Sequence, residues 1–164
     1  MKKVISFFIL VLSLNFSSRA QELNTIVPGA AKNIPDGWHK FTFQGAKFDV
    51  EIKSEGLTEG NIVWFDQSIY SGTLRGYTIA GRGTYVWPNR ERYEGSFRNN
   101  MRYGKGTMFY KDGTRHYGKW KDNKKNGKGQ EYNKEGELVR DGLWKNDVFV
   151  EVSKKKKKSK KKKN

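Results

Sequence analysis

Hydrophobic and polar residues alternate along residues 70–150. In one part of this stretch, Tyr93, Gly95 and Phe97 have a period of two, so these three positions share one face of a β-strand. A second predicted strand, residues 106–110, follows the glycine pair Gly104 and Gly106. Residues that favour tight turns separate one run from the next. The pattern therefore predicts β-hairpins rather than helices.

The hairpin pattern repeats every 23 residues, which is typical of a repeat architecture. Each unit keeps a central glycine with an aromatic residue two positions before or after it, and a later Gly-x-Gly pair, except that the last unit is offset by one residue and lacks the pair. A glycine between two aromatic positions leaves a gap, and we expect a ring from a neighbouring hairpin to cover it. The positions with a predicted structural role are Tyr70, Gly72, Gly81, Gly83, Tyr93, Gly95, Phe97, Gly104, Gly106, Gly118, Trp120, Gly127, Gly129, Gly142 and Trp144.

Two sets of residues are expected to reverse the chain. Inside each hairpin, a residue that tolerates the left-handed conformation follows the second aromatic column: Gly76, Asn100, Asn123 and Asp147. Between hairpins, the expected tight turns are Pro88-Asn89, Asp112-Gly113 and Glu135-Gly136.

The run Tyr93-Glu94-Gly95-Ser96-Phe97, followed by Gly104-Lys105-Gly106, resembles the Tyr-x-Gly-x-Trp…Gly-x-Gly pattern of MORN repeats. The resemblance covers about residues 57–150, and the first and last copies depart from the pattern. It implies a module for interaction or membrane association that mostly carries no chemistry of its own. We expect an all-β fold: an elongated, twisted, single-layer antiparallel sheet of about eight to ten strands, made of successive β-hairpin (MORN-like) repeats.

The sequence divides into five segments. Residues 1–20 resemble a secretory signal peptide, with two lysines, an apolar run and a small residue at Ala20; an uncleaved signal anchor is the alternative. Cleavage after Ala20 predicts an exported protein, in the periplasm, at the cell surface or outside the cell. The other segments are a linker or arm (21–37), an N-terminal hairpin with a degenerate leading repeat (38–69), MORN-like repeats (70–152) and a disordered polylysine tail (153–164).

Charge is concentrated at the C-terminus. The net charge is +16, of which three positive charges lie in the leader and nine in the tail, so residues 21–153 carry only +4. The tail lysines are predicted to tether the protein to an anionic surface, and a solvated tail without a partner is the alternative. These lysines are Lys154, Lys155, Lys156, Lys157, Lys158, Lys160, Lys161, Lys162 and Lys163.

Stacking the repeats also predicts two rows of basic side chains. One row is Arg75, Arg98, Lys121 and Lys145, and the other is Arg82, Lys105 and Lys128. If each hairpin adds two strands, successive members lie about 10 Å apart. The rows are predicted to form a basic stripe that binds anions. The alternative is that these charges only maintain solubility and prevent edge aggregation.

Several classes of function lack support. The sequence has no cysteine, no metal-spaced histidine pair and no nucleophile motif, so we expect no cofactor, no metal, no small-molecule substrate and no catalysis. His116 occupies a tyrosine position, where packing is the expected role. The leader argues against nucleic acid as a partner. The expected partner is an anionic lipid, an envelope polymer or a protein, and a self-assembling scaffold of the envelope is the alternative function.

Overall fold

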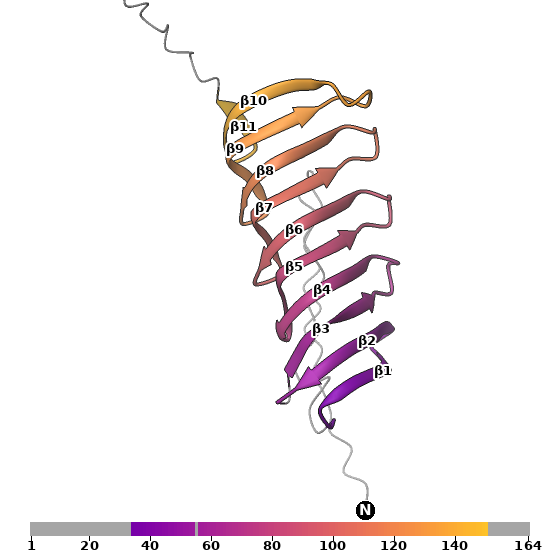
Figure 1. Cartoon of the computed structure of the whole chain (residues 1–164). Coiled ribbons are helices and arrows are strands. Elements are labelled where there is room, and N and C mark those ends of the chain that lie inside the picture. Colours follow the sequence, from indigo (N-terminus) through magenta and orange to yellow (C-terminus); the bar gives the residue numbers. More distant parts are fainter. Residues whose placement is uncertain (1–33, 55, 151–164) are drawn as a thin grey trace, which may run out of the picture.

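The computed structural model describes residues 34–54 and 56–150, which form one open antiparallel sheet (Figure 1). The strands lie in the sheet in the order in which they occur in the chain. They are β1 (Gly37–Phe43), β2 (Ala46–Lys53), β3 (Gly56–Val63), β4 (Ile69–Gly76), β5 (Thr78–Val86), β6 (Arg92–Arg98), β7 (Met101–Phe109), β8 (Arg115–Lys121), β9 (Lys124–Tyr132), β10 (Leu138–Lys145) and β11 (Val148–Val150).

The predicted fold class is therefore confirmed. The described residues form eleven strands, where the sequence predicted about eight to ten. The last hairpin closes with only three residues, β11, and so short a strand has no distinct sequence pattern. At the other end, β1 and β2 turn at Gln44 and Gly45, both with positive φ. The proposed leader, residues 21–33 of the proposed linker and the polylysine tail lie outside the described residues.

Narrow two-residue turns close each hairpin of the array. In three of them both turn residues have positive φ, as expected for type I′ turns. These pairs are Asn99–Asn100, Asp122–Asn123 and Asn146–Asp147; in the first hairpin only Gly76 is left-handed.

Wider turns at the opposite sheet edge join one hairpin to the next. Tyr110 accepts a hydrogen bond from the N–H of Gly113 and donates one to Thr114, and the same pair of bonds recurs in the other copies. The left-handed residue is Gly113 in this turn and Gly136 in the next. The expected turn at Pro88-Asn89 lies in the equivalent place, and its left-handed residue is Arg90, directly after this pair.

A bulge in the second strand of the hairpins β4–β5, β6–β7 and β8–β9 bends the sheet. In the middle hairpin Gly95 pairs with Gly106 and Phe97 pairs with Arg102, so Ser96 faces three residues of β7. Gly104 lies within this bulge at a φ of 81°, a conformation that favours glycine. Gly81 and Gly127 occupy the same place with φ of 72° and 106°. Because bulges increase local bending and lie in register, the strands curve together.

An aromatic ring packs against the paired glycines of each hairpin. A Cβ added at Gly95 would lie 2.5 Å from the Cα of Gly106 and 2.6 Å from the Oη of Tyr93. The Tyr93 hydroxyl also donates a hydrogen bond of 3.1 Å to the carbonyl of Ser96. Tyr93 thus covers the glycines of its own hairpin. Tyr70 covers Gly72 and Gly83 in the same way. A ring of the next hairpin also reaches the paired glycines, as expected: Trp120 Nε1 donates a hydrogen bond of 3.1 Å to the carbonyl of Gly106, and a Cβ added at Gly129 would lie 3.1 Å from the Trp144 ring.

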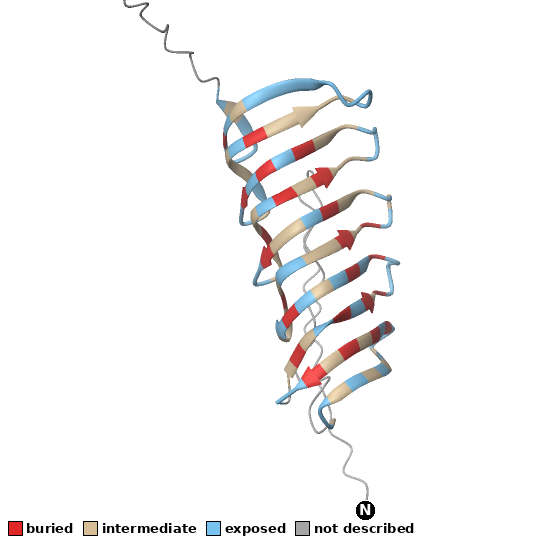
Figure 2. Ribbon diagram, viewed as in Figure 1, coloured by how far each residue is buried: buried red, intermediate tan, exposed pale blue. Residues whose placement is uncertain are grey.

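The aromatic rings form a continuous buried face, which we call the aromatic face. Buried and exposed residues alternate along the strands (Figure 2). Edge-to-face contacts join successive repeats: the ring centroid of Tyr70 lies 5.6 Å from that of Phe97, and the ring centroid of Tyr93 lies 5.4 Å from that of Trp120. A single-layer sheet thus builds a core along its length from rings that pack side by side. The opposite side of the sheet is called the outer face.

We expect Gly95→Ala to lower the free energy of unfolding by about 2–3 kcal/mol, because the new methyl group must displace the Tyr93 ring or the facing strand. Urea unfolding followed by tryptophan fluorescence measures the change. Ser71→Ala, at an exposed position on the outer face, is the control and should change stability by less than about 0.5 kcal/mol. Equal effects of the two substitutions would contradict this account of the paired glycines.

Candidate binding surface

A row of basic side chains crosses the outer face at right angles to the strands. Arg82 pairs with Ser96 between β5 and β6, and Lys105 pairs with Lys119 between β7 and β8. Lys119 in turn faces the bulge that contains Lys128. We call Arg82, Lys105, Lys119 and Lys128 the basic row. All four residues are exposed. The sequence analysis missed Lys119 because it compared equivalent positions and did not consider pairing across strands.

The second predicted row follows the edge with the narrow turns. Arg75, Arg98, Lys121 and Lys145 each directly precede a two-residue turn and are exposed. The guanidinium of Arg98 lies 3.7 Å from the ring centroid of Tyr103. Within residues 34–54 and 56–150, no member of either row has a carboxylate partner within 4 Å. The positive charge of the outer face is therefore not neutralised locally.

Arginines and aromatic rings alternate in a third line on the same face. Strand pairing aligns Arg92 with Phe109, Phe109 with Arg115, and Arg115 with Tyr132. The guanidinium of Arg92 lies 4.2 Å from the Phe109 ring centroid, and that of Arg115 lies 4.5 Å from the Tyr132 ring centroid. These contacts hold long side chains along the sheet surface.

Between the basic row and this third line lies a shallow trough of about 440 Å³. Side chains from β5 to β8 line it, and Glu94 is its one carboxylate. Arg92 forms an ion pair of 2.8 Å with Glu94, which offsets that charge. The lining residues are Arg82, Gly83, Thr84, Glu94, Gly95, Ser96, Lys105, Gly106, Thr107 and Tyr117. The trough is cationic and rich in hydroxyl groups.

Two cations lie among rings on the aromatic face, and the sequence analysis identified neither. Arg102 is 6% exposed, with its guanidinium 4.5 Å from the ring centroid of Trp120 and its Nη2 donating to the carbonyl of Asn123. Burial lowers the pKa of its guanidinium. Lys125, one repeat later, lies 4.6 Å from the Trp144 ring centroid. The recurrence of a basic residue after 23 positions is the signal that would have revealed them.

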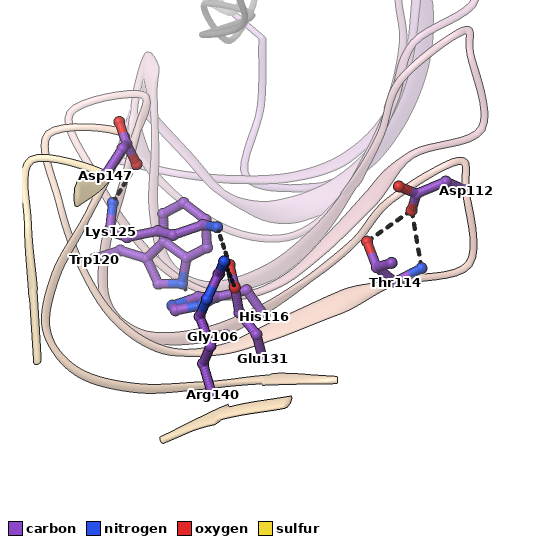
Figure 3. Close-up of polar contacts among 9 residues, drawn as sticks. All are labelled: Gly106, Asp112, Thr114, His116, Trp120, Lys125, Glu131, Arg140 and Asp147. Carbon is purple, nitrogen blue, oxygen red and sulfur yellow. Dashed lines mark hydrogen bonds and ion pairs between the residues drawn. The ribbon is translucent and has the colours of Figure 1, made fainter. Parts of the chain in front are cut away.

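Lys125, Glu131, Arg140 and His116 form a polar cluster inside the curve of the strands (Figure 3). Glu131 accepts hydrogen bonds from Lys125 at 2.6 Å and Arg140 at 2.8 Å. Burial alone would raise the pKa of Glu131, but these two bonds outweigh it and hold the pKa below its usual range. The Glu131–Arg140 pair bridges β9 to β10 and the Lys125–Glu131 pair lies within β9, so the last full repeat has a partly ionic core.

His116 takes the place of Tyr93 in this repeat. It is fully buried against Gly118 and Gly129, with the rings of Trp120 and Trp144 at 5.4 and 4.9 Å. Its Nδ1 lies 3.8 Å from Glu131, and neither ring nitrogen has a hydrogen-bond partner among the described residues. Burial, together with the charge of Lys125, lowers the pKa of His116 to about 4. The trough does not include His116.

Reciprocal hydrogen bonds join each narrow turn to the preceding hairpin. Asn123 Oδ1 accepts from the N–H of Arg102 at 2.8 Å, and the N–H of Asn123 donates back to the carbonyl of Arg102 at 3.2 Å. Asn100 binds Ile79 in the same way, and Asp147 binds Lys125. These side-chain oxygens, which glycine lacks, explain why Asn100 and Asn123 suit positions where the MORN pattern has glycine.

The described part of the chain also contains neither a candidate metal site nor a membrane-spanning helix. Residues 34–54 and 56–150 contain no group of three or more histidine and acidic side chains placed to hold a metal ion. The same residues form no helix long and apolar enough to cross a membrane.

An open sheet of 23-residue hairpins, bent in register and packed through one aromatic face, defines a class of hairpin-repeat proteins. The family model described as "MORN repeat" matches residues 70–92, 93–115 and 116–137. The chain therefore contains three MORN repeats over residues 70–137, and MORN repeats are generally interaction modules rather than enzymes. A comparison with curated proteins gave no match.

Acid should destabilise the fold through His116. Its pKa is about 4 in the folded state and about 6.5 when unfolded, so protons bind the unfolded chain preferentially between these values. The contribution of His116 to the free energy of unfolding is therefore fully present above pH 6.5, and it is lost as the pH falls from 6.5 toward 4. We expect a loss of about 2 kcal/mol between pH 7.5 and pH 5, measured by urea unfolding.

His116→Tyr is the matched variant, because it restores the residue found at this position in the two preceding repeats. It should remove most of this pH dependence, since tyrosine does not titrate below pH 8. Glu131 does not confound the comparison, because its lowered pKa acts only below about pH 4.5. An unchanged slope in the variant would contradict the assignment to His116.

Proposed function

We propose that this protein is a non-enzymatic, exported binding module that attaches through its outer face to an anionic surface of the cell envelope. The observation that carries the proposal is the basic row: four exposed cations in register on consecutive repeats, without carboxylate partners among the described residues. Charges aligned in this way produce a field that attracts polyanions more strongly than the same charges scattered over a surface. The second row, at the turn edge, extends the positive region.

The two ends of the sequence support the same proposal. The apolar run and Ala20 fit a leader that directs export, and nine lysines near the C-terminus add attraction to any anionic surface. Each lysine close to a charged bilayer contributes roughly 1 kcal/mol, which decays within a Debye length. In this proposal the tail lysines attract the protein electrostatically to the anionic surface, and the outer face then binds that surface directly.

The test is binding of the full chain to anionic and neutral vesicles at increasing salt. Neutralising the basic row (Arg82→Gln, Lys105→Gln, Lys119→Gln and Lys128→Gln) should weaken anionic binding by about tenfold and reduce its salt dependence. A version ending at Val152 measures how much of the binding to anionic vesicles depends on the lysine tail. Neutral vesicles measure any binding by the leader, which is common to all variants.

The matched control neutralises four exposed lysines elsewhere: Lys40→Gln, Lys53→Gln, Lys111→Gln and Lys134→Gln. It removes the same total charge. If this control weakens anionic binding as much as the row variant, the arrangement of the row has no role. If neither the row nor the tail matters, the basic residues serve solubility.

Self-assembly into a scaffold is the second candidate, and an apolar sheet edge favours it. β10 pairs with β9 along its length but with β11 only from Leu143 to Lys145, so on the side away from β9 its first half has no strand partner among the described residues. Leu138 and Val139 lie there and are 51% and 55% exposed. A second copy of the chain would bury them by adding a strand to this edge.

Sedimentation velocity at increasing protein concentration tests this second candidate. Self-association should raise the sedimentation coefficient, and Leu138→Lys together with Val139→Lys should abolish the rise, because charges on an edge strand oppose pairing. Because both residues are exposed, the fold should survive. A concentration-independent monomer would eliminate the scaffold.

A further inference from the structure

We propose that the outer face binds a linear acidic polysaccharide that lies along the basic row, across strands β5 to β9. This inference rests on the proposed function and names the ligand class of that same surface. Its support comes from three features: the line of cations, the hydroxyl-rich trough beside it and an exposed tyrosine ring. Together they match the carboxylate or sulfate groups, the hydroxyl groups and the ring faces of acidic sugars.

The cations form a line rather than a patch. Arg82, Lys105, Lys119 and Lys128 lie on β5, β7, β8 and β9, which are neighbouring strands of one sheet apart from the gap at β6. With strands about 4.8 Å apart, the last three cations follow one another at one strand spacing. An extended polymer with an anionic group on each sugar, or on every second sugar, can therefore pair with the row without coiling.

The trough provides hydrogen-bonding partners suited to sugar hydroxyls. The side chains of Thr84, Ser96 and Thr107 line it beside Arg82 and Lys105. Hydroxyl groups both donate and accept hydrogen bonds, as sugar hydroxyls do. The trough's one carboxylate, Glu94, is held by Arg92, so it does not oppose an anionic ligand.

Tyr117 provides an aromatic surface at the end of the trough. It is 45% exposed, although its strand neighbours His116 and Gly118 are buried. A ring of this size exposed beside cations adds apolar contact area for the ring faces of a sugar. A flexible inorganic polyanion could use the cations but would gain nothing from the tyrosine.

The shape of the sheet argues against a bilayer as the preferred ligand of this row. Viewed along the array, the strands curve around Trp120 and Lys125, so the outer face is the convex side (Figure 3). A convex surface meets a flat membrane along a narrow line, whereas a polymer can follow that line over its whole length. Vesicles are therefore a comparison arm in the test.

The experiment measures binding of the full chain to polygalacturonate, to dextran as an uncharged polysaccharide, to inorganic polyphosphate and to anionic vesicles, at one ionic strength. The variants are the neutralised basic row, the four-lysine control (Lys40, Lys53, Lys111 and Lys134), the version ending at Val152, and Tyr117→Ala. Phe65→Ala, at a ring that is 84% exposed and lies outside the trough, is the control for Tyr117→Ala.

The proposal expects binding to polygalacturonate and none to dextran. Neutralising the row should weaken that binding by about tenfold, and the four-lysine control should weaken it less. Tyr117→Ala should weaken it about fivefold while leaving polyphosphate binding unchanged, because the ring contact is specific to sugars.

Other outcomes overturn the inference and separate it from the proposed function. If vesicles bind and polygalacturonate does not, or if Tyr117→Ala has no effect, the outer face is a general anion-binding surface and only the proposed function stands. If the version ending at Val152 loses all polygalacturonate binding, the tail and not the row is the polysaccharide site. If no anionic ligand binds, both proposals fail.

Discussion

A ring packed against two facing glycines is the contact on which each hairpin of this sheet depends. Gly95 and Gly106 leave a gap between β6 and β7, and Tyr93 fills it while its hydroxyl satisfies a backbone carbonyl. A single-layer sheet has no second layer to cover its apolar side, so the rings must bury one another. Their edge-to-face contacts with rings of the next repeat join separate hairpins into a continuous array.

This packing decides which side of the sheet is available for binding. Rings occupy the inside of the curve, and the in-register bulges at Gly81, Gly104 and Gly127 turn that side inward. The outer face is left with side chains that extend into solvent, at spacings set by strand pairing. A repeat that conserves its core can thus vary its outer residues and still display them in straight lines.

The composition of the core changes along the array. In one column the residue changes from Tyr85 to Met108 to Glu131, and in another from Ile79 to Arg102 to Lys125. The last full repeat therefore depends on ion pairs where the first depends on apolar contacts. Ion pairs respond to pH and salt more than apolar burial does, so this end of the array should be the more sensitive to solution conditions.

The sequence by itself determined the hairpin repeat, the all-β class and the left-handed turn positions, because period-two alternation, recurring glycines and asparagine or aspartate in turns are local signals. Tertiary structure decided what depends on contact across strands. Tyr93 covers its own glycines rather than a neighbour's, Lys119 completes the basic row, and Arg102 is buried among rings. Each follows from pairing register and curvature, which bring together residues whose spacing in the chain gives no sign of their contact.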